Sequence, residues 1–292
     1  CAWHTAGLTR LPAMFRGSTP DHHVLRCIMN NWNSTLANRT WYVIAFTLLS
    51  IAAAFFLPAL PQPVEYHDFS DQRQLFGVAN FFDGVSNAGF VLVGVVGLFV
   101  VLRRRTPFEY DRERWPYAIF FVGMVLTGLG SGYYHLFPDN ERLFWDRLPM
   151  TIAFMSLIAA QIVDRISIRA GLVLLLPMLL VGAATVVYWL ATERAGAGNV
   201  VPYAILQAYS VIILIAIAWL YPSRYTRGND IYGVFAAYVV AKVLETFDAE
   251  VFAMGHLLSG HTLKHVAAAI AGLIVLRMLA VRRLDRRSSE MS

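Results

Sequence analysis

The chain has 292 residues, of which 57% are hydrophobic and 15% charged, and its mean hydropathy is +0.53. Soluble domains carry about 25% charged residues, so this composition excludes a secreted enzyme, a cytosolic α/β domain and a coiled coil. The net charge of +5 points to no nucleic-acid partner, because basic loops on one side of a membrane explain it. The chain is therefore expected to lie in a lipid bilayer.

Continuous apolar segments predict an all-α, polytopic transmembrane helix bundle, because about 20 helical residues cross a hydrocarbon core. From the N-terminus onward, the spans are predicted at residues 41–60, 84–102, 116–135, 147–163, 170–191, 201–220, 230–250 and 261–281. The seventh is the least hydrophobic, since it contains Lys242, Glu245 and Asp248. Their helical spacing places these side chains on one face, where structural pairing is favoured over catalysis.

The basic residues predict how these spans are oriented. With eight spans and both termini in the cytoplasm, 18 of the 24 Lys and Arg residues fall in inner segments and 4 in outer loops. Such a bias follows the positive-inside rule. The predicted organisation is a single membrane domain with tails, in the order polar tail, extra span, seven-helix domain and basic tail: residues 1–40, 41–62, 65–281 and 282–292.

Three histidines lie at the ends of predicted spans. His135 closes the third span, and His261 and His265 open the eighth, four residues apart. This spacing lets one helix offer two imidazoles to one metal ion. In the predicted topology all three lie at the same outer depth of the membrane. Three neutral histidines with an open position are typical of catalytic zinc sites; packing between helices is the simpler alternative.

Two further polar side chains lie near the predicted zinc site. Asp146 begins the fourth span and could orient or deprotonate a metal-bound water, or it could be an acid favoured by the positive end of the helix dipole. Ser131 lies one helical turn before His135. Its hydroxyl could stabilise an oxyanion or donate to the backbone of its own helix.

The pattern Ser131-x3-His135-x10-Asp146, followed by His261-x3-His265, resembles the alkaline ceramidases. These enzymes belong to a superfamily of seven-helix membrane hydrolases that also includes the progestin and adipoQ receptors. The resemblance implies that the three histidines hold Zn²⁺, that the aspartate activates its water, and that the serine supports the oxyanion.

The resemblance covers about residues 65–281, and the spans from residue 84 onward correspond to the family's seven helices. It implies a zinc-dependent amidase that hydrolyses ceramide or a related lipid amide to a sphingoid base and a fatty acid. Its partners are then a membrane lipid and the bilayer, with the active site toward the non-cytoplasmic side. A receptor-like lipid sensor is the main alternative, and a proton-coupled transporter is another.

The family also has an acidic, calcium-binding loop before its first helix. The matching segment here offers four candidate Ca²⁺ ligands: Asp68, Asp71, Asn80 and Asp83. Calcium takes six to eight oxygens, but Arg73 stands where another oxygen ligand would be expected. An exposed acidic loop without a metal is the alternative.

Overall fold

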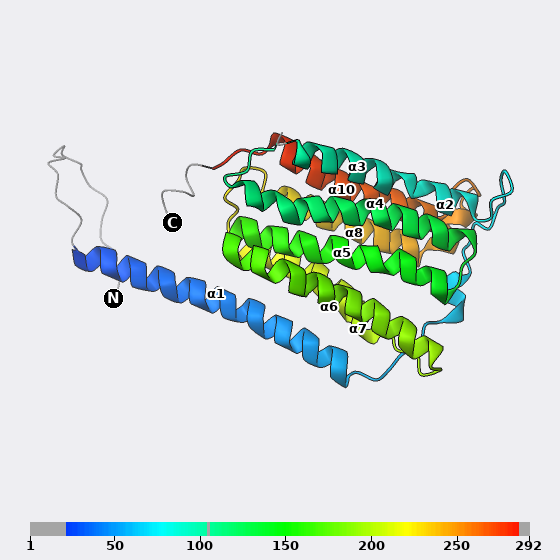
Figure 1. The fold of residues 1–292 in the computed structure, drawn as a ribbon, viewed down its shortest axis with the longest axis horizontal. Helices are drawn as coiled ribbons and strands as arrows, with labels where there is room; N and C mark the ends of the chain where they lie inside the picture. Colours follow the sequence, from blue (N-terminus) through cyan, green and yellow to red (C-terminus); the bar gives the residue numbers. More distant parts are fainter. Residues whose placement is uncertain (1–21, 104–105, 286–292) are drawn as a thin grey trace, which may run out of the picture. The chain divides into compact units, whose positions relative to one another are not determined.

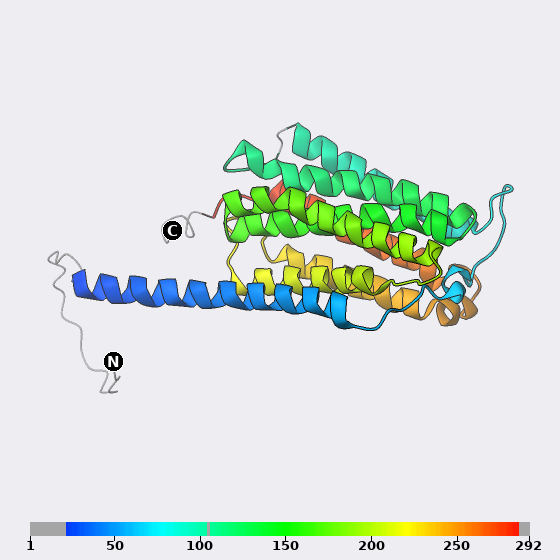
Figure 2. The same cartoon turned by 60° about the horizontal axis from the view of Figure 1, so that its bottom comes forward.

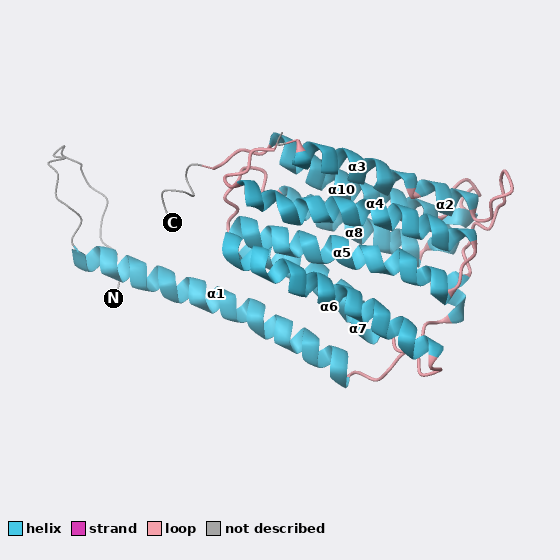
Figure 3. Ribbon diagram, viewed as in Figure 1, coloured by secondary structure: helices cyan, strands magenta, loops and turns pink. Residues whose placement is uncertain are grey.

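The computed structural model describes residues 22–103 and 106–285, with side chains from Arg39 onward. The described residues form helices and no β-strand, which confirms the predicted all-α class (Figure 3). The chain divides into two compact units, residues 1–42 and 43–292. The second unit contains every element that positions the candidate site.

The long helices in the described residues are α1 (His22–Phe56), α3 (Ala88–Leu102), α4 (Arg114–Leu136), α5 (Asn140–Arg165), α6 (Ile168–Arg194), α7 (Val201–Leu220), α8 (Asp230–Thr246) and α10 (Gly260–Val281). Four short elements accompany them: η1 (Val64–His67), α2 (Phe81–Ser86), η2 (Asp111–Glu113) and α9 (Asp248–Ala253). Helices α3 to α8 and α10 run alongside one another as a bundle (Figures 1 and 2).

Seven helical segments of the described chain are long and apolar enough to cross a membrane: Arg39–Phe56, Phe81–Leu102, Asp111–Leu136, Asn140–Arg165, Ile168–Arg194, Val201–Leu220 and Gly260–Val281. Each overlaps a predicted span, and the protein is a multi-pass integral membrane protein. The predicted span 230–250 is instead divided between α8, which has 17 residues, and the short α9. The division comes at Phe247, whose backbone leaves the helical conformation.

The N-terminal tail predicted for residues 1–40 differs from the structure in one respect. Helix α1 begins at His22, well before the expected start of the first span at residue 41. Residues 1–21, and residues 286–292 of the predicted basic tail, lie outside the described residues. Within the second unit, α1 contacts α7 through a hydrogen bond between the Thr47 and Tyr209 hydroxyls, 3.0 Å apart.

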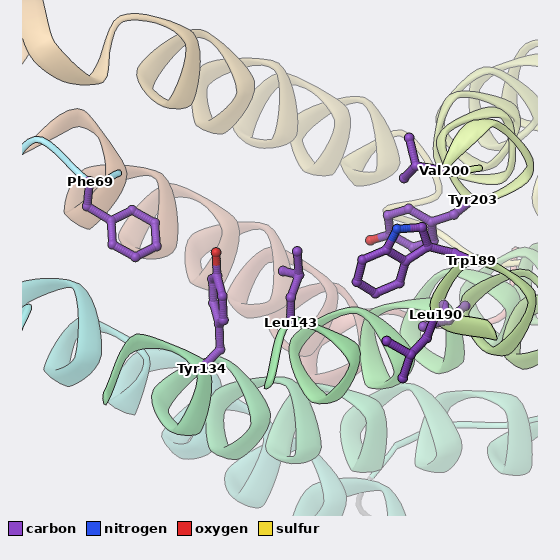
Figure 4. Packing of buried hydrophobic residues seen from close by; sticks show 8 residues of the cluster. Phe69, Tyr134, Leu143, Trp189, Leu190, Val200 and Tyr203 are labelled. Atoms are coloured by element: carbon purple, nitrogen blue, oxygen red, sulfur yellow. The ribbon is translucent and has the colours of Figure 1, made fainter. Parts of the chain in front are cut away.

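One end of the bundle, on the right in Figure 1, carries η1, α2 and α9. A cluster of buried apolar side chains packs there between the end of α4, the start of α5, and the α6–α7 connection (Figure 4). Its members are Phe69, Tyr134, Leu143, Val186, Trp189, Leu190, Val200 and Tyr203. Close packing, together with interhelical hydrogen bonds, holds helices together in lipid, so this cluster fixes the helix ends that carry the candidate site.

Candidate metal centre and active site

The three predicted zinc ligands lie together at this end of the bundle. His135 comes from the last turn of α4, and His261 and His265 come from the start of α10. The His261 ring centroid lies 4.9 Å from each of the other two, which are 5.1 Å apart. One ring nitrogen from each histidine lies within 4.8 Å of the other two. In the part of the chain that the structure describes, this is the one cluster of three such ligands found.

The histidine nitrogens have the bonding state that a metal site requires. His135 Nδ1 and His261 Nε2 are buried without a hydrogen-bond partner. Buried polar atoms are paired in the great majority of cases, so two unpartnered nitrogens in one histidine cluster are compatible with the binding of a metal ion. A set of three imidazoles suits Zn²⁺ and leaves a fourth position open.

The third histidine is oriented by a serine. Ser86 Oγ donates a hydrogen bond to the carbonyl oxygen of Asp83, and its other contact is His265 Nδ1 at 2.8 Å. The hydroxyl proton is therefore already used, so the imidazole donates from Nδ1 and its lone pair is on Nε2. Such an outer partner fixes the tautomer of a metal-binding histidine.

The start of α10 is held by side chains that are distant in sequence. Asp83 Oδ1 accepts hydrogen bonds from the hydroxyls of Thr262 at 2.5 Å and Ser259 at 3.1 Å. Asp248 Oδ1 accepts from the backbone N–H of His261 at 2.7 Å. Because the first N–H groups of a helix have no partner within it, Asp248 satisfies one of them, and the two carboxylates together fix the position of His261, the first predicted zinc ligand on α10.

Phe69 covers the histidines from the loop after η1. Its ring centroid lies 4.6 Å from that of His135 and 4.5 Å from that of His261, and the side chain is buried. The next residue, Ser70, donates its backbone N–H to Asp248 Oδ2 at 3.1 Å. The carboxylate that holds α10 therefore also holds this loop, and the loop shields the histidine nitrogens from water.

The predicted catalytic pair is in contact. The Ser131 side chain lies beside the carboxylate of Asp146, and both residues line a cavity that His265 also lines. Ser131 is buried on α4, one turn before His135. The structure thus brings together all five residues of the predicted zinc and catalytic set.

Gly130 makes this contact possible. A Cβ built there would lie 1.9 Å from the carbonyl oxygen of Trp145, whereas at Gly132 its nearest neighbour would be 4.0 Å away. Small residues of this kind let membrane helices approach closely. We expect Gly130→Ala to destabilise the protein by at least about 2 kcal/mol, since overpacking forces α4 and α5 apart.

The measurement is thermal unfolding in detergent. Gly132→Ala is the matched control and should unfold at nearly the wild-type temperature. Equal stability of the two variants would contradict the close approach of the helices at Gly130.

Comparison with known proteins identifies the family. The sequence model described as Ceramidase matches residues 74–292, roughly three quarters of the chain. The chain belongs to the ceramidase family. No curated protein matches the chain in sequence. Membership makes the chain a hydrolase of the amide carbon–nitrogen bond of ceramide, which decides between this activity and the receptor-like alternative.

The cavity of this ceramidase has a volume of about 380 Å³ and is lined by both polar and apolar side chains. Ser131, Asp146 and His265 line it near the histidine cluster. Apolar side chains of α4, α5, α7 and α8 also line it, among them Met124, Phe154, Leu157, Leu214 and Phe235, and so do charged side chains such as Arg147, Glu245 and Lys264. A lipid with a polar amide and an acyl chain suits this mixed lining.

The sequence indicated a polar network of Lys242, Glu245 and Asp248 on the seventh span. In the structure, only two of these three residues pair with each other. Glu245 pairs with Lys242 on α8 and, at 2.7 Å, with Lys264 on α10. Asp248 lies apart from this network, in α9. Lys264 lies between His261 and His265 in the sequence of α10.

The calcium site expected in the ceramidase fold finds no support. Asp68 is exposed, whereas Asp83 is buried and directed at α10. Asn80 donates its side-chain N–H to the carbonyl oxygen of His135 at 2.9 Å. Asp83 and Asn80 therefore bond to different helices, α10 and α4, and Asp68 is exposed.

Asp71, the remaining candidate Ca²⁺ ligand, pairs with Arg73. Arg73 Nε and Nη2 donate to the two carboxylate oxygens of Asp71 at 2.7 and 2.6 Å, and Nη2 also donates to the carbonyl oxygen of Leu257 at 2.7 Å. Burial alone would raise the pKa of Asp71, but the hydrogen bonds from Arg73 outweigh it and hold the pKa below its usual range. The carboxylate is therefore ionised at neutral pH and fully engaged by the guanidinium.

Proposed function

We propose that this ceramidase is a zinc-dependent amidase, with residues 65–281 as its hydrolase domain. The observation that carries the proposal is the buried histidine cluster, in which His135 and His261 each present an unpartnered ring nitrogen. His135, His261 and His265 would hold the ion. When bound, Zn²⁺ polarises the carbonyl of the scissile amide and lowers the pKa of a water molecule toward about 7.

Asp146 is proposed as the general base and acid. Its carboxylate accepts a proton from the attacking water and returns that proton to the nitrogen of the amide, so that the amine leaves as a neutral product. The new bond joins the water oxygen to the carbonyl carbon, and the carbon–nitrogen bond breaks. The products are a sphingoid base and a fatty acid.

Ser131 is proposed to stabilise the oxyanion once this proton has been transferred. While Asp146 is ionised, the neighbouring serine hydroxyl would donate to the carboxylate. Once the carboxyl group holds a proton, it can donate to the serine oxygen, which frees the hydroxyl to donate to the developing oxyanion. Donors aimed at charge that develops in the transition state are an effective means of lowering the barrier.

We infer eight spans, with both termini in the cytoplasm and the active site toward the opposite side. Helix α8 would be the additional span, since its 17 residues lie within the range that crosses a bilayer. The distribution of arginines supports this orientation. A reporter fused after Ser292 should report a cytoplasmic location, and an external signal would overturn the orientation.

The experiment that tests the function is fatty-acid release from a short-chain ceramide by detergent-purified protein. Activity should vanish on chelation of bound metal and return when Zn²⁺ is restored. Restoration by Zn²⁺ together with about one zinc per chain would support the metallo-amidase. Full activity in protein that contains no metal would overturn it.

A further inference from the structure

Helix α8 presents one face to the cavity, and this face changes from apolar to charged along the helix. Ile231, Val234 and Phe235 line the cavity from the first turns of α8, whereas Lys242 and Glu245 line it from the last turns. Residues three or four positions apart share a helical face. Because α9 follows directly after α8, the charged turns lie at the end of the bundle that carries the histidine cluster (Figure 1).

An ion pair joins these turns of α8 to α10 beside the third predicted zinc ligand. Lys264 Nζ donates to Glu245 Oε1 at 2.7 Å, and Lys264 directly precedes His265 in the sequence. All three residues line the cavity. The ammonium group also interacts electrostatically with the carboxylate of Asp146, the proposed base. The ion pair therefore lies beside the groups proposed to act on the scissile amide.

Both partners of this ion pair can be reached from the cavity and have unused hydrogen-bonding capacity. The Lys264 side chain is 17% exposed and that of Glu245 is 21% exposed. In the residues that the structure describes, Glu245 is the one hydrogen-bond partner of Lys264 Nζ, so two of the three ammonium hydrogens stay available. Each Glu245 oxygen accepts from one lysine, Lys264 or Lys242, and a carboxylate oxygen has two lone pairs. The pair thus offers a donor and an acceptor side by side.

A purely structural role does not account for the position of this ion pair. Charged groups inside a membrane are costly and mark substrate pathways, and a buried ion pair contributes little net stability because desolvation offsets the attraction. The pair between Arg227 and Asp230 at the other end of α8 is not among the residues that line the cavity. The cavity position of Lys264 and Glu245 therefore favours a role in binding.

We propose that Lys264 and Glu245 together bind a hydroxyl group on the sphingoid part of ceramide. A hydroxyl group can accept a hydrogen bond from the ammonium group and donate one to the carboxylate at the same time. Ceramide carries hydroxyl groups on the two carbons that flank the carbon bearing the amide nitrogen. This inference rests on the proposed position of the scissile amide at the histidine cluster, and it makes the ion pair a determinant of specificity.

The test compares three amides with the same acyl chain in zinc-loaded protein. One is a ceramide built on sphinganine, and the others are its analogues that lack the hydroxyl group on the first or on the third carbon of the base. Fatty-acid release gives kcat and KM for each. We expect kcat/KM to be about 10- to 100-fold lower for the analogue without the bound hydroxyl, the effect of a hydrogen bond to a charged group. The analogue that shows this loss identifies the hydroxyl group that the ion pair binds.

Substitutions then connect this preference to the ion pair. Lys264→Met keeps the apolar stem without the ammonium group and should lower the preference by about tenfold or more. Glu245→Gln, on a helix that provides no zinc ligand, should also lower it, because a neutral acceptor forms a weaker hydrogen bond than a carboxylate. Lys264→Arg should keep part of the preference, since it retains a charged donor. Arg227→Met removes the cation of the pair with Asp230 and is the matched control, with the preference of the wild type.

Two results would overturn the inference. One is a wild-type enzyme with equal kcat/KM for the three amides, a comparison that depends on no substitution. The other is a Lys264→Met or Glu245→Gln variant that retains its zinc and its fold and is slowed equally on all three amides, as a merely structural residue would be. Zinc content and thermal unfolding identify variants that have lost the metal or the fold.

Failure of this inference is distinguishable from failure of the proposed function. Hydrolysis of the ceramide by the wild type without discrimination among the three amides removes only the role of the ion pair. If zinc-loaded wild type hydrolyses none of the three amides, the proposed function fails and this inference fails with it.

Discussion

Replacing His261 with alanine should remove the bound zinc and lower fatty-acid release by at least about 1,000-fold. The ion contributes several kcal/mol of transition-state stabilisation, and about 4 kcal/mol corresponds to a factor of 1,000 in rate. Two histidines would remain, and one of them, His135, lies across the cluster on a different helix. The measurements are metal content by mass spectrometry and initial rates of hydrolysis.

His256→Ala is the matched control for this experiment. His256 is exposed and stacks edge-on against Phe252, outside the histidine cluster. The control should retain both zinc and activity. Normal metal content and rate in His261→Ala would show that the cluster is a packing arrangement, and the zinc proposal would be wrong.

The second large effect is expected for Asp146→Asn. The amide has nearly the shape of the carboxylate and keeps an oxygen that accepts from Ser131, but it cannot take a proton from water. We therefore expect normal zinc content, little change in KM, and a kcat about 10²- to 10⁴-fold lower, the range attributed to a positioned acid or base. Single-turnover rates separate this chemical step from product release.

Glu141→Gln is the control for removal of a carboxylate from α5. Glu141 forms an exposed ion pair with Arg194, and exposed pairs contribute about 0–1 kcal/mol to stability. Its kcat should remain close to that of the wild type. A wild-type kcat in Asp146→Asn would overturn the role of the aspartate as base while leaving the metal proposal intact.

The sequence was sufficient for features that depend on local periodicity. Apolar runs of membrane length predicted the helical class, because a backbone in lipid must satisfy its hydrogen bonds within the helix. The interval between His261 and His265 placed their rings on one face, because four residues are about one helical turn. Orientation then predicted that His135 lies at the same end of the bundle, and the structure brings the three rings together.

The sequence was misleading where the role of a carboxylate was predicted from its residue type alone, without knowledge of its hydrogen-bond partner. Asp71 and Asp83 look like calcium ligands because both are carboxylates in one short segment. In the structure, Asp71 accepts hydrogen bonds from Arg73, and Asp83 accepts one from Thr262. The second donor lies on a helix far along the chain, and no pattern of spacing predicts which group will satisfy a buried carboxylate.

Composition and spacing by themselves therefore determined the membrane class, the histidine cluster and its position in the bundle. Only the tertiary structure decided what surrounds that cluster: Ser86 on His265, Asp248 on the start of α10, and Phe69 over the rings. The physical reason is that helical periodicity is a property of neighbouring residues. Burial and hydrogen-bond partners arise only when segments distant in sequence pack against one another.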